Sequence, residues 1–309
     1  MKNKFMKNKI LFFTALSGVI LLISSCSAPR SILHTGRVTQ HKTFRAGADY
    51  SFNFSTAPVG AAYKSVKTIT KNLINKDSII LDEQILNLSK TAVSYVLDPI
   101  ASGYDINLRY GVLPKTDIGY KYSSGCHVFD LRYQFMGNSN YTEAIDKKSL
   151  CGSIGLQYST QNFELPSLFG LVDLQKILGL NVERKDFLIP LAFSTDFGNT
   201  EKIGSFAFGA AYNLSFIHYS FNPEKIYQYD NSNILIHLPI IDEKKVYHSA
   251  GLFVNCKVGY KFIYFIPSLS MYYQNYGTYK LLGGTAQIKG LTIIPSLGLQ
   301  FNFKFWKDK

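Results

Sequence analysis

The sequence predicts an all-β protein: a transmembrane antiparallel β-barrel of about ten strands, within a range of about eight to twelve. The first reason is composition, because 15% aromatic and 17% charged residues with a mean hydropathy near zero are too apolar for a disordered chain. Second, beyond the N-terminus no stretch of about 18 apolar residues runs unbroken, which excludes a multi-helix membrane protein. Third, apolar and polar residues alternate with period two, which is typical of strands.

Residues 1–25 have the pattern of a signal peptide, with lysines and no acid in the first nine residues and an apolar run over 10–23. The tetrapeptide Ile23-Ser24-Ser25-Cys26 resembles the lipobox of bacterial lipoproteins. The resemblance implies lipidation of Cys26 after cleavage; an ordinary secretory signal is the alternative. In some Gram-negative groups an acidic signal after that cysteine directs export to the cell surface. Residues 27–30 contain no acid, so the anchor is expected to face the periplasm.

Residues 26–43 are expected to form a lipidated tether that precedes the barrel of 44–309. This stretch and its border are basic, and the compartment makes anionic headgroups or solvent better partners for them than a nucleic acid. The residues concerned are Arg30, His34, Arg37, His41, Lys42 and Arg45.

Ten segments carry the alternation. In the last of them Leu297, Leu299 and Phe301 alternate with small or polar residues, so one face is apolar and the other is polar. The polar faces are rich in Gly, Ser, Asn, Gln and opposed charges, which suits a barrel interior, and the apolar faces suit contact with lipid. The expected strands are 44–54, 103–112, 115–123, 126–136, 151–161, 186–196, 203–219, 246–260, 262–275 and 290–305.

The connections between these strands form two sets. On the outer side they are 55–102, 124–125, 162–185, 220–245 and 276–289, most of them long, whereas those on the periplasmic side are mostly short. Outer-membrane barrels have this asymmetry. In the first outer connection, Leu81, Ile85, Leu88, Ala92 and Val96 follow helical spacing, which predicts a short helix; two further strands within 66–98 are the alternative.

Three prolines fall inside expected strands. Pro190, Pro267 and Pro295 cannot donate to a ladder, so we expect them to mark bulges or strand starts.

The chain resembles the lipid-anchored outer-membrane β-barrel proteins of Gram-negative bacteria. The residues that carry this resemblance are the lipobox ending at Cys26, the stretch from Leu108-Arg109-Tyr110-Gly111 to Asp117-Ile118-Gly119, the strand Asp130-Leu131-Arg132-Tyr133 and the final aromatic alternation. The resemblance implies location in the outer membrane, contact with its lipids, and handling by the barrel-assembly and lipoprotein-export machineries.

Six charged residues on the second to fourth strands are expected to point into the lumen: Asp105, Arg109, Asp117, Lys121, Asp130 and Arg132. Paired charges in a low-dielectric interior are stable only when each has a partner, so we expect a luminal charge network; a selectivity or ligand site is the alternative. Eight strands leave an interior that side chains fill, and ten add modest room, which argues against free diffusion of large solutes.

Catalysis and metal binding have little support. His218, His237 and His248-Ser249 are the candidates for a lipid hydrolase at the outer rim, yet no Gly-x-Ser-x-Gly motif surrounds them. The cysteines at 126, 151 and 256 have no zinc-ligand spacing. No enzyme activity, metal or cofactor is therefore predicted.

The sequence thus predicts an outer-membrane barrel lipoprotein with a structural, binding or narrow-channel role. The alternatives are a transporter or binder of small hydrophobic molecules, which the strand prolines would help by interrupting ladders, an outer-leaflet lipid hydrolase, and a lipid-tethered periplasmic β-sandwich.

Overall fold

The computed structural model describes residues 30–56, 73, 79–138, 150–163, 171–198 and 203–304. The predicted signal peptide and Cys26 lie outside the described residues.

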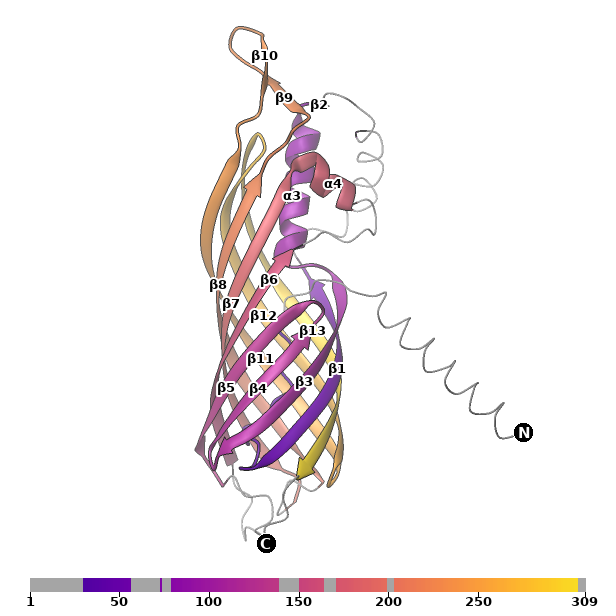
Figure 1. Cartoon of the computed structure of the whole chain (residues 1–309), viewed down its shortest axis with the longest axis vertical. Coiled ribbons are helices and arrows are strands. Elements are labelled where there is room, and N and C mark those ends of the chain that lie inside the picture. Colours follow the sequence, from indigo (N-terminus) through magenta and orange to yellow (C-terminus); the bar gives the residue numbers. More distant parts are fainter. Residues whose placement is uncertain are drawn as a thin grey trace, which may run out of the picture.

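Ten strands form one closed antiparallel barrel, in the order β1-β13-β12-β11-β8-β7-β6-β5-β4-β3, with β3 returning to β1 (Figure 1). They are β1 (Thr43–Ser55), β3 (Ala101–Leu113), β4 (Thr116–Ser123), β5 (Cys126–Met136), β6 (Leu150–Phe163), β7 (Leu180–Asp196), β8 (Gly204–Phe221), β11 (Ile241–Tyr260), β12 (Ile263–Leu281) and β13 (Gly284–Lys304). The predicted barrel of ten strands is confirmed, and its closure is incompatible with a β-sandwich.

Several strands extend further than predicted at one end. The expected loop 276–289 is mostly strand, because β12 and β13 meet at a turn of two residues, 282–283. The expected loop 220–245 is shorter in the structure, because β8 continues to Phe221 and β11 starts at Ile241. We call this the outer end, because the long connections lie there, and the opposite end, with turns such as 114–115 and 261–262, the periplasmic end.

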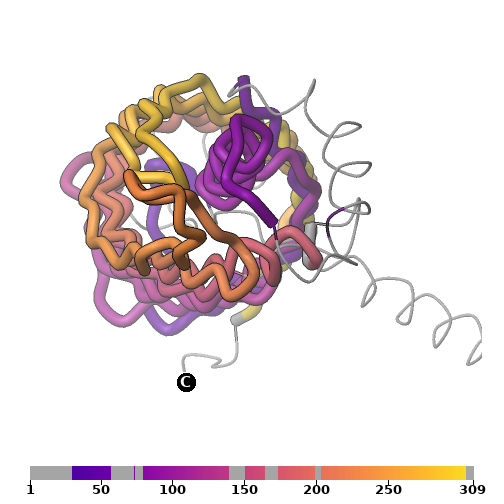
Figure 2. The backbone as a smooth tube through the Cα atoms, turned by 90° about the horizontal axis from the view of Figure 1, so that it is seen from above, coloured from indigo at the N-terminus to yellow at the C-terminus, as the bar shows by residue number. Residues whose placement is uncertain are grey.

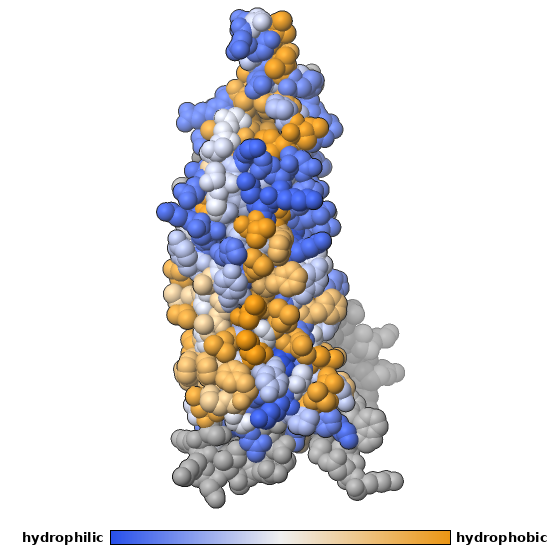
Figure 3. All heavy atoms as spheres, turned by 90° about the vertical axis from the view of Figure 1, so that its left-hand side faces the viewer, coloured by the Kyte–Doolittle hydropathy of each residue, from blue (hydrophilic) through white to orange (hydrophobic). Residues whose placement is uncertain are grey.

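Along its axis the barrel has two layers, a lower, transmembrane layer and an outer layer above it. Apolar side chains point outward in the lower layer and inward in the outer layer. In β8, Phe206 and Phe208 are exposed on the outside while Asn213 is buried in the lumen, as lipid outside and polar side chains inside require. Further along the same strand, Ile217 and Tyr219 are the buried ones. Figure 3 shows apolar side chains gathered over the lower part of one side and polar ones over much of the upper part. The outer layer is therefore exposed to water on its outside and encloses an apolar core.

Helix α3 (Glu83–Leu97) packs into that apolar core. Asp82 caps it by accepting a hydrogen bond from the Ile85 backbone N–H at 3.0 Å. Ile85, Leu88 and Ala92 are buried among aromatic and aliphatic side chains of the tall strands. Seen from above, α3 lies within the outline of the ring of strands (Figure 2). The predicted helix is confirmed.

The unequal lengths of the strands explain where helix α3 packs. Strands β7, β8, β11, β12 and β13 have 17 to 21 residues, whereas β1, β3, β4 and β5 have 8 to 13. Helix α3 rises beside the tall strands and above the ends of the short ones (Figure 1). Beside it lie helix α4 (Leu171–Leu178) and a small sheet of β2 (Ile79–Ile80), β9 (Ile226–Tyr229) and β10 (Leu235–His237). None of the helices in the described residues is long and apolar enough to cross a membrane.

The three prolines lie inside strands and shift no register. Pro190 pairs with Ala211 of β8, while on its other side the ladder of β6 and β7 skips it and resumes in the same register. Pro267 and Pro295 interrupt one neighbouring ladder each in the same way. The prediction that they mark bulges or strand starts is wrong, because a strand in a sheet tolerates a missing N–H on one side when the flanking pairs hold the register.

Candidate functional site

The six residues predicted to face the lumen come together inside the barrel. Strand β3 contributes Asp105 and Arg109, β4 contributes Asp117 and Lys121, and β5 contributes Asp130 and Arg132. Their even spacing along each strand puts them all on the inner face.

These six side chains form two groups of ion pairs, one of four residues and one of two, which we call together the luminal charge network. Arg132 binds Asp117 at 2.6 Å, and Lys121 binds Asp105 at 3.1 Å. Arg109 bridges two carboxylates, with 2.7 Å to Asp117 and 2.7 Å to Asp130. In this network each charge has an oppositely charged neighbour, the condition under which buried charges are tolerated.

A glycine makes the central bridge possible. Gly119 of β4 lies in register between Arg109 of β3 and Asp130 of β5. A Cβ at Gly119 would lie 2.6 Å from an Asp130 carboxylate oxygen and 2.9 Å from an Arg109 guanidinium nitrogen. The missing side chain therefore leaves the space in which the two charges meet.

Residues 30–42, the luminal segment, run through the lower part of the barrel, from beneath helix α3 to the periplasmic end. Beneath α3, the Tyr272 hydroxyl donates to the Arg30 carbonyl at 2.9 Å, and the Ser31 hydroxyl donates to Asp105 at 2.8 Å. At the periplasmic end, the Lys42 backbone N–H donates to the Gly111 carbonyl at 2.9 Å.

Between these two ends the segment is bonded to several strands. The Arg132 guanidinium donates to the Thr35 carbonyl at 3.2 Å, and the Thr39 backbone N–H donates to Asp117 at 2.6 Å. Arg37 forms an ion pair with Asp196 at 2.5 Å. Residues of the luminal charge network thus bind the luminal segment in addition to one another.

This placement corrects the expected tether for the residues that the structure describes. Arg30, Arg37 and Arg45 are buried in the lumen, and His34 hydrogen-bonds Gln157 there at 2.8 Å. His41 and Lys42 are exposed at the periplasmic end. Arg30, His34 and Arg37 therefore face carboxylate and amide groups of the barrel interior instead of lipid headgroups.

A second charged cluster closes the outer end of the lumen, beneath α3. Arg30 lies 3.7 Å from Asp98, which follows the last turn of α3, and donates to the Tyr247 hydroxyl at 2.9 Å. Arg184 pairs with Asp186 at 2.7 Å and donates to the Leu97 carbonyl at 3.1 Å. A guanidinium at a helix C-terminus satisfies a carbonyl that has no partner within the helix. Sequence patterns gave no sign of this cluster, since its partners lie far apart in the chain.

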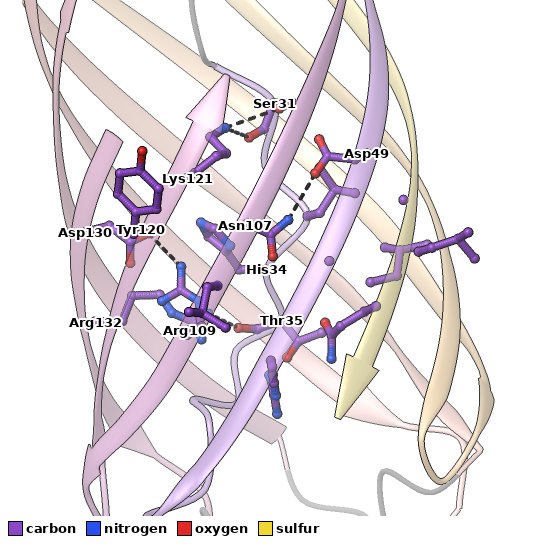
Figure 4. Close-up of a pocket in the computed structure, with 18 of the residues that line it drawn as sticks. Ser31, His34, Thr35, Asp49, Asn107, Arg109, Tyr120, Lys121, Asp130 and Arg132 are labelled. Atoms are coloured by element: carbon purple, nitrogen blue, oxygen red, sulfur yellow. Dashed lines mark hydrogen bonds and ion pairs between the residues drawn. The ribbon is translucent and has the colours of Figure 1, made fainter. Parts of the chain in front are cut away.

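Little space is left in the lumen. Figure 4 shows the cavity between the luminal segment and the inner wall, with His34, Asp49, Asn107, Arg109 and Lys121 among the side chains around it. Its volume is about 50 Å³. A water needs roughly 10–15 Å³ and a small-molecule pocket measures about 300–1,000 Å³, so this cavity has room for water only.

The histidines proposed for a hydrolase lie apart from one another. His248 points outward and contacts the Tyr212 hydroxyl, whereas its neighbour Ser249 is buried inside the wall, so the two cannot act together. The His237 ring contacts the Tyr227 ring in a tilted arrangement, with centroids 4.3 Å apart. His218 Nε2 lies 2.5 Å from an Asp242 carboxylate oxygen on the adjacent strand. In the described part of the chain, no group of three or more His, Cys, Asp and Glu side chains could hold a metal ion.

The closed antiparallel barrel, apolar outside and polar inside in its lower layer, is the design of outer-membrane proteins. The protein is a transmembrane β-barrel of that type.

The sequence matches no protein-family model and no curated protein. Among solved structures, the barrel resembles the attachment invasion locus protein Ail of Yersinia pestis, with 9% identity over 85% of this chain and 100% of that chain and a TM-score of 0.31. Neisserial surface protein A is 10% identical over 84% of this chain and 97% of that chain, with a TM-score of 0.30. A major outer membrane protein from Thermus thermophilus is 8% identical over 84% of this chain and 99% of that chain, with a TM-score of 0.33. At these values no function transfers to this barrel.

Proposed function

We propose that the protein is an outer-membrane barrel lipoprotein whose lumen is closed by its own N-terminal segment, so that its role is structural or binding. The observation that carries this proposal is the course of the luminal segment, residues 30–42, along the whole lumen, with hydrogen bonds or ion pairs at both ends and in between. Two luminal cavities, of about 50 Å³ and about 10 Å³, support a closed barrel over an open channel.

Single-channel recording in planar bilayers tests this proposal. The full-length protein is expected to be silent, and a variant lacking residues 30–41 is expected to conduct. Because the deletion also leaves luminal acids without partners, the full-length Arg37→Asp variant provides a second probe, since it places a carboxylate against Asp196. Steady conductance of the native protein would overturn the proposal, whereas silence of a folded deletion variant would show that helix α3 and its apolar core close the barrel without the segment.

Lipidation of Cys26 belongs to the proposal, and the luminal segment bears on the side of the anchor. The lack of an acidic signal in 27–30 favours the periplasmic side. Arg30, however, lies at the outer end of the lumen, beside Asp98. Cys26 precedes it by four residues, a span of at most about 14 Å in a fully extended chain. This limit supports an anchor in the outer leaflet, and we propose that side.

Labelling of intact cells distinguishes the two sides. An Ala28→Cys variant should react with a membrane-impermeant maleimide at the cell surface, and a Lys261→Cys variant, in the turn at the periplasmic end, should react only after the outer membrane is permeabilised. Protection of position 28 in intact cells would return the anchor to the periplasmic side. Radiolabelled palmitate incorporation that persists in Cys26→Ala would exclude this residue as the lipidation site.

An outer-leaflet lipid hydrolase is the second candidate function, and one observation favours it. His218 faces outward with Asp242 at 2.5 Å, and Ser220 lies opposite Asp242 in register. A histidine oriented by a carboxylate can act as a general base toward a nearby hydroxyl. Release of fatty acid from phospholipid micelles by the native protein, lost in Ser220→Ala and His218→Ala, would establish this activity. Absence of release from the native protein would remove it.

Transport of small hydrophobic molecules has less support. The cavity in the lumen is too small for such a molecule, and the ladders resume in unchanged register past the strand prolines. The strands keep their pairing on both sides of each proline, which gives no support to a lateral opening there.

A further inference from the structure

A groove of about 510 Å³ lies on the outside of the barrel, over β8 and between β7 and β11. The side chains that matter here define it as the outer-wall groove: Glu183, Lys185, Phe187, Phe216, His218 and Lys244. It is separate from the lumen, because outward and inward side chains alternate along each of these strands.

The strand register brings charged groups to the groove from both sides. Glu183 of β7, His218 of β8 and Lys244 of β11 form one row across the three strands. In the row below, Lys185 of β7 lies beside Phe216 of β8. Since neighbouring strands lie about 4.8 Å apart, Lys185 and Lys244 line the groove from two strands that are about 10 Å apart.

The groove lies at the upper limit of the apolar belt. On β8 the outward positions are apolar or aromatic up to Phe216 and polar from His218 onward. On β7 the same change occurs between Phe187 and Lys185, and on β11 between Val246 and Lys244. Aromatic residues mark the level of lipid headgroups, so the charged end of the groove stands where phosphates lie.

The two lysines and the glutamate that define the groove have no ion-pair partners in the described part of the chain, whereas His218 pairs with Asp242. Neither Lys185 nor Lys244 forms an ion pair there, and the Glu183 carboxylate forms none either. Their neighbour Glu243 is different, because Lys280 at 2.5 Å and Lys245 at 3.1 Å bind it. Hydrogen bonds from these two lysines hold the pKa of Glu243 below its usual value.

An apolar surface continues below the charges, toward the membrane interior. The rings of Phe187 and Phe216 lie edge to face with centroids 6.0 Å apart, and Tyr158 lies next to Phe187 at 5.1 Å. These rings run sideways across β6, β7 and β8 and face the lipid. An acyl chain placed against them would bury apolar area that is otherwise exposed.

We propose that the outer-wall groove binds one phospholipid with a phosphoethanolamine headgroup. The phosphate lies between the ammonium groups of Lys185 and Lys244, the lipid ammonium pairs with Glu183, and an acyl chain follows Phe216 and Phe187. This headgroup fits better than an anionic one, because a second negative group would meet the carboxylate of Glu183.

Quenching of tryptophan fluorescence by brominated lipids tests the headgroup preference. The chain has one tryptophan, Trp306, which Trp306→Phe removes. In that background Phe216→Trp reports on lipid in the groove, and Tyr50→Trp, on β1 and 54% exposed, is the matched lipid-facing control. Vesicles of phosphatidylcholine carry a minor fraction of dibrominated phosphatidylethanolamine, phosphatidylglycerol or phosphatidylcholine.

The expected result is roughly fivefold enrichment of phosphatidylethanolamine over phosphatidylcholine at position 216 and none at position 50, as two or three exposed ion pairs would give. Lys185→Ala with Lys244→Ala should abolish the enrichment, and Glu183→Gln should shift preference toward phosphatidylglycerol. Equal quenching by all three lipids, or preference for phosphatidylglycerol in the native groove, would overturn the proposal. Heat-modifiable migration in gels verifies that each variant is folded.

Discussion

Arg132 and Asp117 form a two-point ion pair inside the barrel, with 3.0 Å from Nε to Oδ1 and 2.6 Å from Nη2 to Oδ2. The same carboxylate also accepts from Arg109 of β3 and from the backbone N–H of Thr39 in the luminal segment. One aspartate therefore joins three adjacent strands to the segment that fills the lumen. Because of these four contacts, we expect the loss of Asp117 to weaken the packing of all three strands and of the luminal segment.

Replacing Asp117 by Asn should lower the free energy of unfolding by about 3–5 kcal/mol, because Arg109 and Arg132 then lose a buried counter-charge. Urea unfolding in phospholipid vesicles, followed by the loss of heat-modifiable migration, measures this. The control is Asp242→Asn, which breaks an exposed pair with His218 and should cost less than about 1 kcal/mol. Equal costs for the two variants would contradict a central role for Asp117.

Replacing Gly36 by Ala should unseat the luminal segment near its periplasmic end. A Cβ at this position would lie 2.2 Å from the Cys151 carbonyl oxygen and 2.8 Å from the Ser194 backbone nitrogen, and neither backbone atom can move aside easily. The Cys151 side chain is 1% exposed in the native barrel, so the rate at which a small maleimide modifies it reports on seating. The rate should rise at least about tenfold, the change expected when local opening becomes about 1.4 kcal/mol easier.

The matched control for Gly36 is Gly284→Ala at the outer end. There the nearest atom to a new Cβ is the flexible side-chain tip of Leu86, at 3.2 Å. The reactivity of Cys151 should stay at its native value in this variant. An unchanged rate in Gly36→Ala would show that the segment tolerates displacement without opening the lumen.

Replacing Leu88 by Ala should destabilise the outer layer alone. Leu88 of α3 is 2% exposed within the apolar core of that layer, and truncation of such a side chain costs about 2–5 kcal/mol. Hydrogen exchange should accelerate in α3 and the upper parts of β12 and β13, while the transmembrane layer keeps its protection. Gln84→Ala, on the exposed side of the same helix, should leave both layers unchanged. Uniform loss of protection would show that the two layers unfold as one.

The strands could be predicted from sequence because period two survives in every one of them, but their outer ends could not. Along β7, Phe187 and Ile189 face lipid, whereas in the outer layer Val182 and Leu180 face the core instead. The apolar residues change face between Asp186 and Lys185, so a search for one continuous apolar face ends the strand there. Where the barrel extends beyond the membrane, its outside is polar and its inside is apolar. In the sequence, the apolar residues therefore move from one set of alternate positions to the other.

The luminal charges could be expected from their strands, but the luminal segment could not. Its contacts come from residues spread over much of the chain, such as Asp105, Gln157 and Tyr272. A basic stretch after a signal peptide also suits a tether near headgroups. One signal was available: the inward position of Asp196 on β7 calls for a basic partner, and Arg37 of the luminal segment supplies it.

Charge reversal across the Arg37 and Asp196 pair tests the course of the luminal segment directly. Each single variant, Arg37→Asp or Asp196→Arg, places like charges in one buried site and should lower the free energy of unfolding by about 3–5 kcal/mol. The double variant restores an opposite pair in the same place, so it should recover at least about half of that loss. The control reverses the more exposed pair of Lys280 and Glu243 in a Lys245→Ala background, because Lys245 also binds Glu243, and its effects should stay below about 1 kcal/mol. Additive losses in the Arg37 and Asp196 double variant would show that these side chains do not meet, and that the segment does not run along β7.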